Sequence, residues 1–93
     1  MPKFEQKQAV MLAQQIFIAA AEDERQMSGF LMQSGIDAHE IRSSIDSPLF
    51  LASFLDYLMG WEPALIAACQ KAEITPDNII PIRQSLSDLH IMS

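Results

Sequence analysis

The stretch that decides the fold is PLFLASFLDYLM, residues 48–59, in which Ser53 and Asp56 are the only polar residues. Pro48 is typical of a first helical turn, because its ring fixes φ and its missing N–H would have no helical partner there. Gly60 follows and predicts the helix end. A helix without a polar face belongs in the middle of a bundle, since any solvent-facing side would leave apolar surface in water. We predict that its buried residues include Leu51, Phe54, Leu55 and Leu58.

Three further helices are predicted on the N-terminal side. Residues 4–21 place apolar side chains at helical spacing, with glutamines on the other face. Residues 23–34 form a second amphipathic segment with Met27, Phe30 and Leu31 on one face, and Gly35 stands where a left-handed residue usually ends a helix. Asp37 with Glu40 three residues later is typical of a capping box, which predicts a short third helix.

Two helices are predicted on the C-terminal side. Glu62 and Pro63 begin a fifth helix that runs to about Glu73, and the Thr75-Pro76 pair begins a sixth. Pro81 lies inside the sixth, where it predicts a kink or an isolated turn before the main helix. The chain of 93 residues is therefore predicted to be all-α, a compact bundle of about six short helices forming a single domain over residues 1–93.

A weak internal repeat has an offset of 38 residues. Ile36-Asp37 aligns with Ile74-Thr75, in each case an apolar residue followed by a helix cap. Two explanations stay open: two similar three-helix units packed face to face, or a chance match between helical apolar patterns.

Several segments also carry a family resemblance. Phe30-Leu31, the run 34–37 (SGID), the run 48–52 (PLFLA) and the run 54–58 (FLDYL) resemble a family of short alphaproteobacterial proteins catalogued as domain of unknown function 3572. The resemblance covers residues 17–86, and it implies an all-helical bacterial cytosolic protein without implying an activity. The chain departs from the family at Glu73, where a glycine is expected before Ile74.

Charge and composition restrict the classes of function. The formal net charge is −6, and the six Lys and Arg residues are scattered singly, so a nucleic-acid partner is not expected. No apolar run approaches the ~18 residues that a membrane span needs, and the N-terminal sequence has no secretory pattern. The single cysteine, Cys69, fits a reducing compartment. We therefore expect a cytoplasmic protein with no membrane partner.

Asp56 is the most informative polar residue, because an unpaired carboxylate is costly to bury in an apolar helix. It could act as a general base or a partner-binding anchor. The favoured interpretation is structural: the carboxylate accepts hydrogen bonds from a helix N-terminus or a basic side chain.

No catalytic, cofactor-binding or metal-binding residue is predicted. Neither His39 nor His90 has a second ligand at the spacing of a known metal site. Cys69 lies among alanines in the middle of a helix, a setting typical of a small core residue rather than a nucleophile. Trp61, at a helix junction, could seal the core or anchor a partner.

Met11 and Ile18 in the first helix have no obvious partner in so short a chain, so with Trp61 they form a possible interaction surface. The alternative is that the second and fifth helices cover both flanks of the first helix. The leading hypothesis is a non-enzymatic protein-interaction module, either a homodimer or an adaptor. The alternative is a small ligand-binding domain or enzyme with a pocket near Asp56 and Tyr57. A pocket above ~300 Å³ lined by Asp56 and a second polar group would favour the alternative, whereas a flat apolar patch on the first helix would favour the module.

Overall fold

The computed structural model describes residues 4–92, apart from the side chains of residues 38 and 87–92. Its elements are the helices α1 (Gln6–Ala21), α2 (Glu24–Ser34), α3 (Ala38–Ser44), α4 (Pro48–Met59) and α5 (Glu62–Ala72), the 3₁₀ turn η1 (Pro76–Asn78), and α6 (Ile79–Met92). The fold is all-α, as predicted, with no strand in the described part of the chain. Within that part, no helix is both long and apolar enough to cross a membrane.

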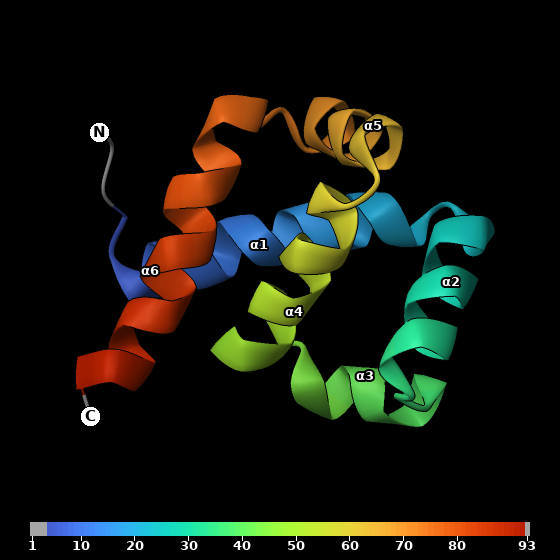
Figure 1. Cartoon of the computed structure of the whole chain (residues 1–93), viewed down its shortest axis with the longest axis horizontal. Helices are drawn as coiled ribbons and strands as arrows, with labels where there is room; N and C mark the ends of the chain where they lie inside the picture. The colour runs from blue at the N-terminus through green and yellow to red at the C-terminus, as the bar shows by residue number, and fades with distance from the viewer. Residues whose placement is uncertain (1–3, 93) are drawn as a thin grey trace.

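The helices divide into a packed group and an arm (Figure 1). Helices α1, α4, α5 and α6 form the group, in which α1 packs against the other three and α4 against α1, α5 and α6. Helices α2 and α3 form the arm, residues 24–44, which borders the group on one side. The backbone of α2 comes close to α1 at their shared corner, whereas the backbone of α3 packs closely against no other helix. Side chains therefore hold most of the arm in place.

Helix α4 supplies the centre of the core. Leu51, Phe54, Leu55 and Leu58 are all 0% exposed, which confirms the burial predicted for them. Small residues on α1 allow α5 and α6 to approach it closely: Ala9, Ala13, Ala19 and Ala20 are all buried. The helix nevertheless has one solvent-facing side, because Leu49, Ser53 and Asp56 recur at intervals of four and three residues and are exposed.

Helix α2 is rotated relative to the expected orientation. Gln26 and Phe30 are its buried residues, whereas Met27 and Leu31 are only half-buried. Gln26 and Phe30 are four residues apart and share one face, and the contacts of Phe30 with α4 set that face inward. In the described structure the Oε1 atom of Gln26 is buried without a hydrogen-bond partner. A buried amide oxygen in this state costs free energy, so Phe30 must outweigh that cost.

The N-cap predicted at Asp37 is confirmed, whereas Thr75 makes no side-chain cap hydrogen bond. Asp37 Oδ1 accepts a hydrogen bond from the His39 backbone N–H at 3.1 Å, and Ser47 Oγ accepts one from the Phe50 N–H at 3.3 Å. Pro81 lies in the first turn of α6, where its missing N–H costs little, and η1 stands before that helix as the isolated turn.

The ends of α2 and α5 share one backbone geometry at the offset of 38 residues. Gly35 has φ +74° after α2, and Glu73 has φ +58° after α5. Each is followed by an isoleucine and then an extended residue, Asp37 or Thr75, that precedes the next helix. The packing beyond these connections differs, because α6 packs against α1 and α4 while α3 stays on the arm. The repeat is therefore local to the two connections.

Replacing Leu55 by alanine tests the central position of α4. We expect Leu55→Ala to lower the free energy of unfolding by about 2–5 kcal/mol, because a fully buried leucine leaves a cavity. Leu49→Ala is the matched control on the same helix, since Leu49 is 55% exposed, and it should change stability by less than about 0.5 kcal/mol. Urea unfolding followed by circular dichroism measures both. Equal effects of the two substitutions would contradict the assignment of α4 as the core helix.

Glu73 is the one non-glycine residue with positive φ in the described chain, so a glycine there should be stabilising. We expect Glu73→Gly to raise the free energy of unfolding by about 0.5–1 kcal/mol, because a side chain in the left-handed region is strained. Gly35→Ala introduces that strain and should lower stability by a similar amount. Gly60 has φ −79°, so Gly60→Ala is the control that should not destabilise. Thermal melts of the three variants measure these effects. If Glu73→Gly were the least stable of the three, backbone strain at Glu73 would be contradicted.

Candidate functional site

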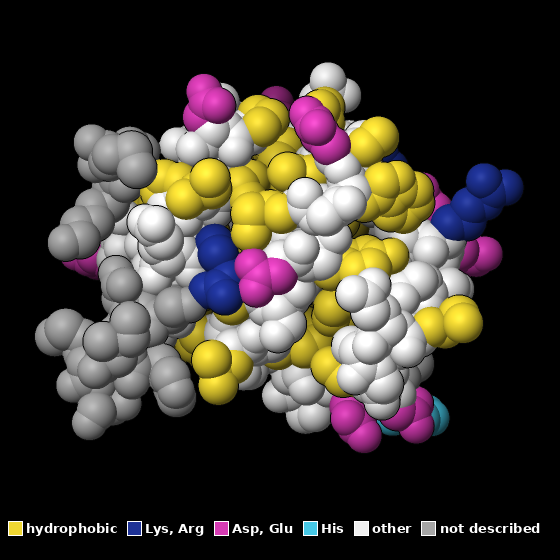
Figure 2. Space-filling model, viewed as in Figure 1, with side chains coloured by type: hydrophobic (Ala, Val, Ile, Leu, Met, Phe, Trp, Pro, Cys, Tyr) yellow, Lys and Arg dark blue, Asp and Glu magenta, His cyan; other side chains and the backbone are white. Residues whose placement is uncertain are grey.

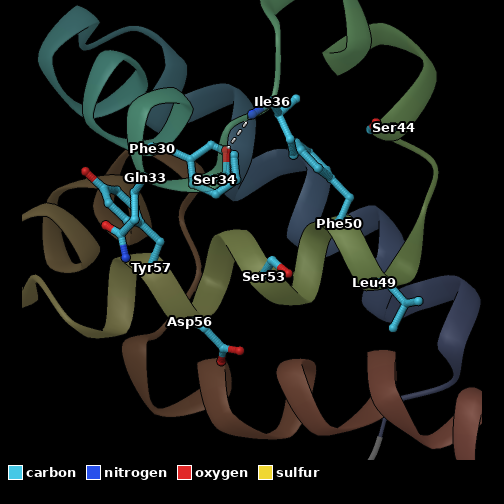
Figure 3. A pocket seen from close by; sticks show the side chains of 10 residues that line it. All are labelled: Phe30, Gln33, Ser34, Ile36, Ser44, Leu49, Phe50, Ser53, Asp56 and Tyr57. Atoms are coloured by element: carbon cyan, nitrogen blue, oxygen red, sulfur yellow. Dashed lines mark hydrogen bonds between the residues drawn. The ribbon is translucent and has the colours of Figure 1, made fainter.

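An open groove of about 570 Å³ lies between the arm and α4 (Figure 3). We call it the groove. The apolar part of its lining comes from α2, the α2–α3 connection and α4: Phe30, Ile36, Leu49, Phe50 and Tyr57. The polar part has five members, of which only one is charged: Gln33, Ser34, Ser44, Ser53 and Asp56.

Aromatic rings fix the floor of the groove. The ring of Phe30 lies between those of Phe50 and Tyr57, with centroid distances of 5.7 and 5.5 Å and edge-on geometry in both pairs (Figure 3). Edge-on packing is the favoured arrangement for such rings, and each pair adds about 0.5–1.5 kcal/mol to the burial energy. Phe54 supports the floor from below, because its ring is 4.9 Å from that of Phe30. The floor is therefore preformed by the core.

A close approach of the Tyr57 side chain to α2 sets one end of the groove. The Tyr57 hydroxyl lies against the α-carbon of Gly29, and a Cβ at this position would clash with it. Gly29 therefore allows Tyr57 to lie flat against α2, although glycine is unfavourable inside a helix. At the other end, Ser34 Oγ accepts a hydrogen bond from the Ile36 backbone N–H at 3.3 Å, which shapes the α2–α3 connection.

Asp56 is on the side of the groove that faces α6, and its carboxylate points toward that helix (Figure 3). The Nε of Arg83 donates to its Oδ1 at 2.8 Å and Nη2 donates to its Oδ2 at 3.0 Å. The Asp56 side chain is 50% exposed and that of Arg83 29%, so the pair is at the surface rather than in the core. Both carboxylate oxygens are hydrogen-bonded, and this bidentate geometry links α4 to α6.

The ion pair also favours the charged form of its basic member. Hydrogen bonds to Asp56 raise the pKa of the Arg83 guanidinium further above its ordinary value, partly opposed by burial. A carboxylate held by a permanently charged guanidinium is poorly placed to abstract a proton from a substrate. The geometry at Asp56 thus suits a structural link between helices better than a general base.

The predicted interaction residues lie elsewhere. Met11, Ile18 and Trp61 are 56%, 59% and 44% exposed, and none of them lines the groove. Met11 and Ile18 share one face of α1, two turns apart, with the exposed Gln15 between them. Ile18 borders a second, shallower hollow of about 280 Å³ beside α5. Gln15 interrupts the apolar patch on α1 that would favour an interaction surface there. The role of Met11, Ile18 and Trp61 in binding a partner stays a prediction.

The residues considered for catalysis or metal binding are not brought together. Cys69 is fully buried, and burial raises the pKa of its thiol, as in a small core residue. His39 is exposed beside the α3 cap, and the side chain of His90 lies outside the described residues. Among the side chains that the structure describes, no three His, Cys, Asp or Glu residues are grouped as a metal site.

The fold and the groove define a class: a small all-α protein with an aromatic cleft between a peripheral helical arm and a packed helical group. The chain belongs to the family described as protein of unknown function (DUF3572), whose profile matches residues 6–89. No curated protein and no solved structure matches it.

The groove was only partly predictable. A pocket near Asp56 and Tyr57 was the alternative hypothesis, and both residues do line the groove. Its volume of about 570 Å³ and its further polar lining, such as Ser53, meet the condition that was set for this ligand-binding or enzyme alternative. The sequence places Leu49 and Phe50 in the core helix and Ile36 in a helix connection. Nothing in the sequence pattern indicates that these three residues line one groove. The available signal was the row formed by Leu49, Ser53 and Asp56, which places one exposed leucine on an otherwise polar face of α4.

A double-mutant cycle tests the structural role of Asp56. We expect Asp56→Asn to lower the free energy of unfolding by up to about 1 kcal/mol, because the ion pair is partly exposed. Arg83→Gln should cost a similar amount, and the double variant should cost less than the sum, which gives a coupling energy of about 0.5–1 kcal/mol. Urea unfolding at low and high salt measures the cycle, and the coupling should shrink as salt screens the pair. A zero coupling energy at low salt would contradict the structural role of Asp56. An Asp56→Asn variant more stable than wild type would contradict it as well.

Proposed function

We propose that this protein is a non-enzymatic interaction module that binds an apolar segment of another protein in the groove. The observation that carries the proposal is the open groove, in which Leu49, 55% exposed, and the half-buried Ile36 and Tyr57 lie beside the buried rings of Phe30 and Phe50. An apolar cleft of this kind can bind side chains of a partner protein. Those side chains leave water when they enter the cleft, and the cleft does not need to rearrange to receive them.

A helical segment is the occupant that fits the dimensions. The groove follows α4 from Leu49 to Tyr57, a rise of about 12 Å. The apolar row of a partner helix at positions i, i+3 or i+4, and i+7 spans about 10.5 Å. Two turns of an amphipathic helix would therefore place their apolar side chains along the floor.

A small apolar ligand is the second candidate, since the volume of about 570 Å³ lies in the range of small-molecule sites. Such sites usually enclose most of the ligand, and this groove is open rather than enclosed. An enzyme is disfavoured because both oxygens of Asp56 are held by Arg83 and the remaining polar lining consists of one glutamine and three serines, beside the Tyr57 hydroxyl.

An adaptor role is favoured over a homodimer. The formal net charge of −6 makes two copies repel one another, and it also opposes binding to nucleic acid. The proposal places the protein in the bacterial cytoplasm, which agrees with a single buried cysteine and with the resemblance of its helix caps to alphaproteobacterial sequences.

The proposal is tested with three synthetic peptides of about 14 residues that share leucines at i, i+3, i+4 and i+7. Their remaining positions carry uncharged polar residues, lysines or glutamates, which gives a neutral, a basic and an acidic peptide. We expect at least one to bind with a dissociation constant below about 100 µM in fluorescence anisotropy. Leu49→Ala should weaken that binding about fivefold, because Leu49 borders the floor.

Ile18→Ala is the matched control, because Ile18 is 59% exposed and lies outside the groove. It should leave the affinity unchanged. If none of the three peptides binds at about 1 mM, the proposed function is wrong. If Ile18→Ala weakens binding and Leu49→Ala does not, the α1 surface is the site instead. Light scattering of the free protein adds a further check, since a stable dimer through the groove would contradict the adaptor role.

A further inference from the structure

We infer that the segment bound in the groove is basic, with lysine or arginine residues at the end that lies beside α3. This inference rests on the proposed function, because it specifies the chemistry of the occupant of the same groove. It is carried by the distribution of charged side chains around the groove, which is uneven.

Two exposed acidic residues are close in sequence to the lining residues at the α3 end of the groove. Asp37 follows directly after Ile36, which lines the groove, and Glu40 is one helical turn before Ser44, which also lines it. Residues four apart are about 40° apart around a helix, so Glu40 is on the side of α3 that carries Ser44, just outside the lining of the groove. Both acids are exposed, and Figure 2 shows acidic side chains gathered over α3 at the lower edge of this face.

Basic side chains of the arm are directed elsewhere. Arg42 is two residues before Ser44, which turns it about 160° away from the groove side of α3. Arg25 is five residues before Phe30, which turns it about 140° away from the groove side of α2. The guanidinium of Arg83 holds Asp56. No Lys or Arg whose side chain the structure describes belongs to the lining of the groove.

The consequence is a negative potential at one end of an apolar floor. Asp56 contributes little to it, because its charge is matched by Arg83. Asp37 and Glu40 are therefore the exposed acids that we assign to the α3 end of the groove, and the net charge of −6 strengthens their field. Basic residues on a bound segment gain from this arrangement, whereas an acidic segment or a second copy of this chain is repelled.

The test compares the three peptides on wild-type protein and on two charge-matched double variants. Asp37→Asn/Glu40→Gln removes the acids beside the groove, and Asp23→Asn/Glu24→Gln removes two acids at the far end of α2, about 14 Å along the helix from Gln33. Each double variant changes the formal charge from −6 to −4. Asp37 and Asp23 are both N-caps, and asparagine caps a helix about as well as aspartate, so both variants should fold.

On wild-type protein we expect the basic peptide to bind about three- to tenfold more tightly than the neutral one, and the acidic peptide to bind most weakly. Asp37→Asn/Glu40→Gln should remove most of this preference and leave the neutral peptide unaffected. Asp23→Asn/Glu24→Gln should keep the preference. Raising the ionic strength from about 0.05 to about 0.5 M should reduce the preference on wild-type protein by screening.

Two results would overturn the inference while leaving the proposed function intact. The first is equal binding of the neutral and basic peptides to wild-type protein. The second is an equal loss of preference in both double variants, which would assign the effect to net charge rather than to the acids beside the groove. Failure of every peptide to bind is a different outcome, because it contradicts the groove as a binding site for protein segments.

Discussion

The contact on which the rest of the structure depends is the pair of edge-on packings made by Phe54. Its ring lies 4.8 Å from that of Phe17 on α1 and 4.9 Å from that of Phe30 on α2, and the residue is 0% exposed. Phe54 thus joins the packed helical group to the arm, and Phe50, 5.7 Å from the same two rings, makes a second such link. Because Phe30 is also the middle ring of the groove floor, the same contact that anchors α2 orients the candidate binding surface.

This anchoring explains why the groove exists. Helix α3 has no close backbone packing with another helix, and α2 has it only with α1. Aromatic side chains are long enough to fix α2 at a distance from α4, and the space beyond their edges stays open as the groove. A segment held mainly by side chains has fewer buried contacts than the packed group, so local opening of the arm should need less free energy than unfolding of the core.

The helices and their ends were predictable because their determinants are local. A proline in the first turn, a capping hydroxyl or carboxylate, and a glycine after the last turn act over four or five residues, as at Ser47, Pro48 and Gly35. The burial of Leu51, Phe54, Leu55 and Leu58 also followed from the continuous apolar run. The orientation of α2 did not, because it depends on where Phe30 meets Phe54, and no local pattern places Gln26 inward instead of Met27.

The groove was harder to predict for the same reason. Leu49 looks like a core residue in the sequence, and it is exposed because α6 and the arm cover the flanks of α4 and leave a strip between them. Asp56 was noticed as a polar residue in an apolar helix, yet its partner Arg83 is 27 residues away and could not be paired with it from spacing alone.

The acidic residues in and beside the groove belong to two different parts of the structure, helix α4 and the arm. Asp56 is on α4 and its charge is matched by Arg83 on α6, so its side of the groove is electrically balanced. Asp37 and Glu40 are on the arm, which has the fewest backbone contacts with the rest of the molecule. A basic segment bound in the groove would rest on α4 and pair with α3 at the same time. Its binding free energy would therefore include the free energy of fixing the arm against the core, so the sequence of the arm would influence affinity even where it makes no contact with the occupant.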